Sequence, residues 1–392
     1  MVTKNNIYLL TFGGLWILYV LNEFAIIYNI KIFNILIPMV LSVYLYKKLS
    51  INTEIRILLL FILSLFISQF LSTFNSQLDQ AIIIPSTMRI IVILFLLIPF
   101  YTIYKMNSKL FDNIFIFSIF IILVSNFYYY FYLYTHMERF RGTFGNPNEF
   151  ALLLSFSSYY LLYYMYIYPV KPKLKILLIT MLGLSMILVL ITLSRSGIII
   201  LLFLYLFYYL AIKKSLSFFK KIILLILVIS VLYLIYITFS SEFLLLIDRF
   251  SGAEGKSSSN MRNIQNAAAI QTLHDNSIIQ WLFGNGTSAS SSLDWFSKYH
   301  TNFSSQVVHR IHNSLIALLV ENGLIGLGLY LFLHLIIFFK LFKLKNQYKY
   351  LLLGYLLGAI MYSQMAYIVY FFPYWLSLII ISIHANQLKD IK

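Results

Sequence analysis

The sequence predicts an all-α polytopic membrane protein. Of its 392 residues, 61% are hydrophobic and only 11% are charged, and the mean hydropathy is +0.85. In a water-soluble globular protein about a quarter of the residues are charged. Most apolar segments are about 17 to 25 residues long, which is the length with which an α-helix crosses about 30 Å of hydrocarbon. A β-barrel would instead show alternating segments of about ten residues.

About twelve apolar segments are long enough to be spans. They cover residues 7–27, 30–46, 55–72, 80–104, 112–134, 147–168, 175–193, 196–212, 221–239, 324–341, 350–368 and 371–387. The polar residues 240–323 are interpreted as a large extracytoplasmic loop with short helices, one around 261–273, and a turn at Gly284-Asn285-Gly286. Transmembrane helices are thus predicted over 1–239 and 324–392.

The lysines predict the orientation of these spans. They occur in short loops, at Lys47, Lys48, Lys105, Lys109, Lys171, Lys173, Lys175, Lys213, Lys214, Lys220, Lys221 and several positions within 340–349. Such positive loops lie on the cytoplasmic side of a membrane protein. Both termini are therefore predicted to be cytoplasmic, and the net charge of +16 is explained without a nucleic-acid partner.

The arginines are distributed differently from the lysines. Six of them are predicted to lie on the outer side: Arg139, Arg141, Arg195, Arg249, Arg262 and Arg310. The planar guanidinium offers a fork of donors suited to phosphate and carboxylate, so this set indicates an anionic ligand outside. The alternative is that some of these arginines pair with the outer acids Glu138, Asp248 and Glu254.

The segment from Arg141 to Glu149 has the pattern of a helix start. Asn146 suits the N-cap, Pro147 suits the first helical position, and Glu149 follows Asn146 by three residues, as in a capping box. The helix is predicted to begin here with its positive end outward. Its free N–H groups, Asn148 and the nearby Arg141 would form an anion cradle, although capping alone also accounts for the pattern.

Two arginines are predicted to lie close to or within the membrane. Arg195 lies in the connection Ser194-Arg195-Ser196-Gly197, between two spans that are barely long enough to cross. A charge held at the interface is costly and indicates a functional partner; the alternative is a side chain that extends toward the headgroups. Arg89, inside the span 80–104, either lines the same cavity or pairs with Glu23 or Asp79.

Residues 311–341 are apolar throughout. As one helix they would measure about 46 Å, which is too long for one ordinary span. We therefore predict a break at Asn322-Gly323, a pair suited to a helix C-terminus. The span then begins near Leu324, and Glu321 is expected at the outer mouth.

The outer helix before this break is predicted to carry His309, His312 and Asn313. The two histidines are three residues apart and would share one face of that helix. A metal site is the alternative interpretation of this H-x-x-H spacing. Neither an HExxH motif nor a cysteine accompanies it, so no metal is predicted.

Three segments on the predicted outer side together resemble a known family. They are Arg141-Gly-Thr-Phe-Gly-Asn-Pro-Asn148, Leu193-Ser-Arg195-Ser-Gly197, and His312-Asn313 followed by Glu321-Asn-Gly-Leu-Ile-Gly326. Their order is similar to that of the O-antigen ligase and Wzy polymerase superfamily, which comprises multi-span bacterial enzymes with a large outer loop. The motifs carry the resemblance from about residue 141 to residue 330, and the rest of the chain agrees by span count only.

The resemblance implies a glycosyltransferase that works at the outer face of the bacterial cytoplasmic membrane without a cofactor. Its donor and acceptor would be undecaprenyl-diphosphate-linked oligosaccharides, and a chain-length regulator protein is a further implied partner. Arg195 and Arg262 would hold the donor diphosphate, and His312 would be the general base on the acceptor hydroxyl. The further candidates for diphosphate or glycan binding are Arg141, Asn148, Asn313, Glu321, His309 and Arg89.

The residue types suit this chemistry. Diphosphate is a good leaving group whose growing negative charge fixed arginines can stabilise, and imidazole titrates near neutral pH. We interpret the chain as a polymerase of O-antigen or capsular repeat units. A ligase that transfers glycan to a lipid A core shares these motifs. A flippase is a different class with a basic cavity, but it would usually show repeat symmetry between halves, which is absent from this sequence.

Overall fold

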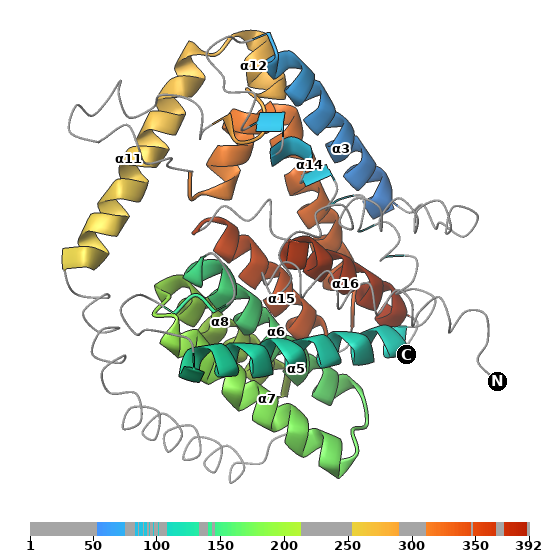
Figure 1. Ribbon diagram of the computed structural model, residues 1–392. Helices are drawn as coiled ribbons and strands as arrows, with labels where there is room; N and C mark the ends of the chain where they lie inside the picture. Colours follow the sequence, from blue (N-terminus) through green and yellow to red (C-terminus); the bar gives the residue numbers. More distant parts are fainter. Residues whose placement is uncertain are drawn as a thin grey trace. The chain divides into compact units, whose positions relative to one another are not determined.

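The computed structural model (Figure 1) describes most of the central and C-terminal chain. The described residues are 53–74, isolated positions from 83 to 101, 108–132, 140–142, 146–212, 253–289, 311–345, 348–365 and 372–389. They form α-helices, and no strand occurs among them, which confirms the predicted all-α class. The predicted spans 7–27, 30–46 and 221–239 lie outside the described residues.

The described helices follow the predicted segments closely. Their bounds are α3 Thr53–Ser72, α5 Ser108–Tyr132, α6 Pro147–Ile167, α7 Pro172–Ile191, α8 Arg195–Ile212, α11 Ala253–Asp275, α12 Ile278–Phe283, α14 Ser314–Phe342, α15 Tyr348–Ser363 and α16 Phe372–Lys389. Within the described part of the chain, six helices are long and apolar enough to cross a membrane. These are α3, most of α5, α6, α7, α8 and α14. The chain is therefore a membrane protein, while the count of about twelve spans stays a prediction.

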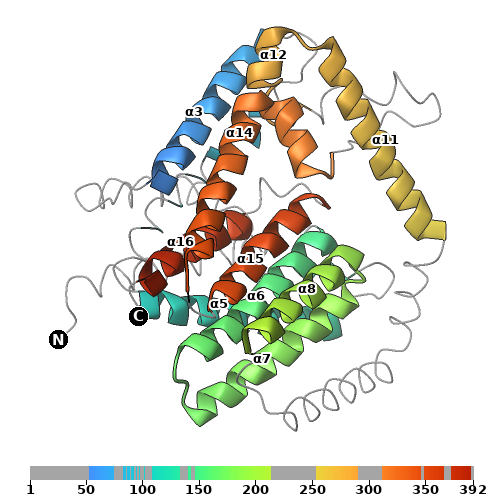
Figure 2. The same ribbon diagram turned by 180° about the vertical axis from the view of Figure 1, so that it is seen from behind.

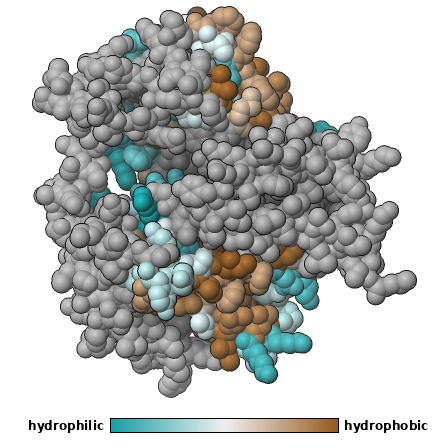
Figure 3. Space-filling model, viewed as in Figure 1, coloured by the Kyte–Doolittle hydropathy of each residue, from teal (hydrophilic) through white to brown (hydrophobic). Residues whose placement is uncertain are grey.

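Apolar side chains on the surface of these helices agree with a lipid environment. Phe70 of α3, Ile176 of α7 and Leu202 of α8 are each about two-thirds exposed, at 64%, 66% and 66%. Apolar residues on the described surface are brown in Figure 3. Because exposed apolar area of this kind is unfavourable in water, these faces suit the hydrocarbon of a bilayer.

Contacts group the described helices into two compact units, which do not follow the order of the chain. The first unit comprises α5, α6, α7, α8 and the beginning of α15. Its central helix is α6, which packs against α5, α7 and α8 (Figures 1 and 2). The Tyr159 hydroxyl of α6 donates to the Leu351 carbonyl oxygen of α15 at 2.8 Å, and Tyr160 of α6 bonds to Asp112 of α5.

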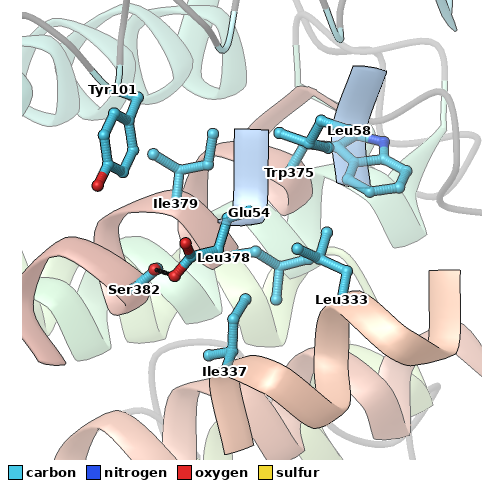
Figure 4. A pocket seen from close by; sticks show the side chains of 9 residues that line it. All are labelled: Glu54, Leu58, Tyr101, Leu333, Ile337, Trp375, Leu378, Ile379 and Ser382. Carbon is cyan, nitrogen blue, oxygen red and sulfur yellow. Dashed lines mark hydrogen bonds between the residues drawn. The ribbon is translucent and has the colours of Figure 1, made fainter. Parts of the chain in front are cut away.

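The second unit comprises α3, α11, α12, α14 and α16, with the end of α15. Residues of α3, α14 and α16, together with Tyr101, line a small cavity (Figure 4). The cavity wall is apolar apart from a few polar groups, of which Glu54 at the start of α3 is the charged one. The buried Glu54 carboxylate bonds to Lys340 of α14 and to Ser382 of α16, so it ties these three helices together.

Gly323 interrupts α14. Its φ is 66° and its ψ is −172°, a combination that is open almost only to glycine. The two arms of the helix diverge from this residue in Figures 1 and 2. The predicted break at Asn322-Gly323 is confirmed, and it separates a first arm, 314–322, from the longer second arm.

The turn after α12 supplies hydrogen-bond donors to this break. The Asn285 and Gly286 N–H groups donate to the carbonyl oxygens of Val320 at 3.0 Å and Glu321 at 2.9 Å. The Ser68 hydroxyl of α3 donates to the same Glu321 oxygen at 2.8 Å. Gly284 has a φ of 80° and Gly286 a φ of 96°, which confirms the predicted turn. Since a helix end leaves carbonyl groups without intrahelical partners, these bonds stabilise the break.

We predict that Gly323→Ala destabilises the protein by more than about 2 kcal/mol, because the added Cβ meets both a strained backbone and a wall. That Cβ would lie 2.3 Å from the Leu282 carbonyl oxygen. The matched control is Gly328→Ala in the second arm, where nothing lies within 4 Å of an added Cβ. Thermal unfolding in detergent measures both variants. Equal melting temperatures for the two would contradict this account of the break.

Candidate functional site

In the first unit, the start of α6 is fixed by its own side chains. Asn146 has extended φ and ψ of −134° and 122°, and its side chain accepts from the Asn148 N–H at 2.9 Å. Pro147 occupies the first helical position and Glu149 lies in the first turn. The predicted helix start at Pro147 is confirmed. The Asn148 side chain is thereby directed away from the capping bond, toward a neighbouring helix.

That neighbour is the start of α8. The Ser194 hydroxyl donates to Asn148 Oδ1 at 2.8 Å and accepts from the Gly197 N–H at 3.2 Å. Ser194 is fully buried, and the Leu193 before it has a positive φ of 52°. Ser194 therefore caps α8 in the way that Asn146 caps α6. One hydrogen bond between side chains joins the two helix N-termini.

Close backbone packing holds the two helices together below this bond. A Cβ at Gly197 would lie 2.5 Å from the Ala151 Cβ of α6. The Ser155 hydroxyl donates to the Ala151 carbonyl oxygen at 2.7 Å and lies 3.2 Å from the Gly197 carbonyl oxygen. The serine and glycine of the Ser194-Arg195-Ser196-Gly197 motif thus have structural roles. Arg195 is the one charged residue of this motif, and it is half-buried at the first position of α8.

Arg141 lies beside the first turn of α6. Its neighbour Phe140 is buried, with its ring centroid 5.9 Å from that of Phe150 in this turn. Gly142, with a φ of 59°, lies so close to Asn126 that an added Cβ would be 2.2 Å from its Oδ1 atom. Arg141 itself is exposed between these two anchored residues.

The first unit therefore gathers positive electrostatic potential at one place. Each helix N-terminus carries the equivalent of about half a positive charge, and Arg141 and Arg195 add whole charges, against which Glu149 sets one negative charge. A cation in the first turn of a helix opposes the macrodipole. The two helix N-termini and both arginines would therefore attract an anion such as phosphate.

In the second unit, the structure corrects the prediction for His312 and Asn313. Neither lies on the outer helix, because α14 begins at Ser314. The Asn313 side chain is the N-cap and accepts from the Leu315 and Ile316 N–H groups at 2.9 and 3.2 Å. His312 is half-buried in the bend before this cap. The prediction that the two histidines share a helix face is therefore wrong for His312, while His309 lies outside the described residues.

The first arm of α14 packs against α11. A cluster of buried apolar residues joins them: Ala268, Ala269 and Leu273 of α11 with Ile311, Ala317 and Val320. Ile311 directly precedes His312, so the histidine follows a residue that is buried in the same cluster as side chains of α11. Arg262 lies on α11 and is half-buried. This helix, Ala253–Asp275, is longer than the predicted piece at 261–273.

Glu321 lies at the other end of the first arm, beside the break, and is 1% exposed. Its backbone carbonyl oxygen belongs to the bonds that stabilise the break. A role of its carboxylate in binding stays a prediction. Arg89 and His309 lie outside the described residues.

Ser194 and Asn285 belong to segments that the sequence pattern identifies, but their partners are not predictable from it. Each bonds to a residue far away in the chain. The capping role of Asn313 was detectable, since an asparagine directly before a long apolar run is a helix-start signal. In the part of the chain that the structure describes, no group of three or more histidine, aspartate or glutamate side chains is arranged to hold a metal ion.

Residues 178–331 match a family model described as O-antigen ligase. The matched segment covers α8, α11, α12, the first arm of α14 and the break at Gly323, together with most of α7. It contains Arg195, Arg262, His312 and Glu321, while Arg141 and Asn148 precede it. A comparison with curated proteins found no match.

Proposed function

We propose that this chain is a membrane glycosyltransferase that polymerises lipid-linked oligosaccharide repeat units, since residues 178–331 match a family model described as O-antigen ligase. The proposed donor and acceptor are undecaprenyl-diphosphate-linked glycans. The reaction would take place at the outer face of the bacterial cytoplasmic membrane, with both termini of the chain in the cytoplasm. A chain-length regulator is a further proposed partner.

The junction between the starts of α6 and α8 carries the proposal. Two helix N-termini joined by the 2.8 Å bond from Ser194 to Asn148 favour a bound anion. Arg195 is the first residue of α8 at this junction, and a guanidinium offers a bidentate donor fork for phosphate oxygens. We assign Arg195 to the donor diphosphate, with Arg141 as a second contact. Charge that develops on the leaving diphosphate would be stabilised by groups that are already fixed before the reaction begins.

We assign the general base to His312 and a second diphosphate contact to Arg262. The resemblance assigns both residues to the same reaction as Arg195. The packing of Ile311 on α11 and the N-cap at Asn313 hold the chain on each side of His312. A base held in this way meets the need of general base catalysis for fixed geometry.

The proposed reaction exchanges one bond for another. The acceptor hydroxyl oxygen attacks the anomeric carbon of the donor sugar, and a new glycosidic bond forms. The bond from that carbon to the diphosphate oxygen breaks, and its electron pair stays on the diphosphate. The hydroxyl proton passes to the His312 imidazole. No cofactor takes part in this scheme.

Ligation is the alternative, because the matched family model is described as O-antigen ligase. In a ligase the same donor would lose its glycan to a separate lipid A core. The residues proposed for the donor diphosphate and for the base would be the same in both reactions. The two differ only in the acceptor.

We predict that Arg195→Ala and His312→Ala each lower chain extension by about a hundredfold or more, since each removes a group that acts in the transition state. Matched controls are Arg56→Ala and His274→Ala, which remove exposed side chains of the same types. Glycan length in cells that carry each variant measures the effect, and immunoblots of membranes measure insertion. Wild-type glycan length with Arg195→Ala or His312→Ala would contradict the assignment.

Asn148→Asp tests the anion site separately. The new carboxylate still accepts from Ser194, and negative charge suits the first turn of α6, so thermal stability should be kept or raised. Repulsion of the donor diphosphate should lower transfer by about tenfold to a hundredfold. The control is Ser277→Asp, which adds the same charge at the N-cap of α12. Unchanged transfer by Asn148→Asp would rule out an anion at this junction.

A further inference from the structure

One face of α11 continues from apolar to polar. Ala269 and Leu273 on this face pack against the segment that begins at Ile311. Gln265 and Asn266 lie one turn earlier, and Arg262 lies a further turn back, three and four residues before these two amides. Side chains at such spacings are neighbours on a helix surface. A guanidinium and two amides thus precede the apolar contact.

The oxygen atoms of these two amides are buried and have no partner among the described residues. Gln265 is 4% exposed. In the part of the chain that the structure describes, the Oε1 atom of Gln265 and the Oδ1 atom of Asn266 are buried and have no hydrogen-bond partner. A buried polar atom without a hydrogen-bond partner destabilises the folded state. A leucine would fill the same space without this cost, so stability does not explain these amides.

The polar turn and His312 border the same packed cluster. The last residues of α11 lead through α12 to the turn whose N–H groups bond to Val320 and Glu321. The C-terminal ends of α11 and of the first arm are therefore held together, and both run toward α12 in Figures 1 and 2. Ile311, directly before His312, belongs to the same buried cluster as Ala268 and Ala269, which follow Gln265 by three and four residues.

We propose that Gln265 and Asn266 form a sugar subsite that binds the first sugar of the donor, the one bonded to the diphosphate. Amide oxygens accept from sugar hydroxyls, and amide nitrogens donate to hydroxyl or acetamido oxygens. This inference rests on the proposed function, in which Arg262 contacts the diphosphate and His312 the attacking hydroxyl. The sugar ring that joins these two reaction partners carries the anomeric carbon. Gln265 and Asn266 follow Arg262 by three and four residues on α11 and come before the residues that share a buried cluster with Ile311, the neighbour of His312.

The test removes the hydrogen-bonding groups of the protein amides by substitution and those of the sugar by chemical synthesis. The variants are Gln265→Leu and Asn266→Leu, and the matched controls are Gln271→Leu and Asn263→Leu, which change exposed side chains of the same helix. The probes are the native lipid-linked repeat unit and synthetic analogues, each lacking one hydroxyl or acetamido group on the diphosphate-bound sugar. Transfer rates and donor-induced shifts of the melting temperature are measured for every pair.

We expect wild type and controls to discriminate against at least one analogue by about tenfold or more, because its loss leaves a buried amide unpaired. The Gln265→Leu and Asn266→Leu variants should discriminate less and should melt, without donor, at or above the wild-type temperature. Undiminished discrimination, or marked destabilisation without donor, would overturn the subsite. If wild type binds donor and Gln265→Leu weakens that binding, but no transfer occurs, the subsite stands and the transferase assignment fails.

Discussion

The break in α14 is the constraint on which the second unit depends. In a continuous helix from Ser314 to Phe342, the first arm would continue along the axis of the second arm and would not be directed toward α11. At Gly323 the chain adopts a backbone conformation that other residues avoid, and the carbonyl groups exposed by the break accept from the turn after α12 and from Ser68. A glycine, a turn and a serine from three places in the chain therefore set the position of the segment that carries His312.

In the first unit, two helix N-termini lie close together. The N-termini of α6 and α8 would repel each other through their partial positive charges, yet the bond from Ser194 to Asn148 and the close approach at Gly197 hold them together. Such an arrangement is favoured when an anion shares the site. In α11, the two buried amide oxygens that lack a partner among the described residues agree with the proposed sugar subsite. In both units, a bound substrate would supply hydrogen-bond partners or opposite charge to polar groups of the protein.

Much of this architecture was predictable because it depends on local signals. The lengths of the apolar segments predict the helices. The Asn146-Pro147 pair predicts the start of α6, and the Asn322-Gly323 pair predicts the break in α14. The prediction that His312 lies on a helix was wrong, because Asn313 caps the helix that begins at Ser314. The bonds from Ser194 to Asn148 and from Asn285 to Val320 were not predictable, because they join residues whose meeting depends on packing between distant segments.

The most direct measurement is made with the purified protein in liposomes that contain a lipid-linked repeat unit as the only substrate. The account predicts a ladder of products that grow by one repeat unit at a time, together with release of polyprenyl diphosphate. Transfer that occurs only when a lipid A core is supplied would identify a ligase. Movement of the lipid-linked unit across the bilayer without any new glycosidic bond would contradict the account, because Arg195 and His312 would then serve transport.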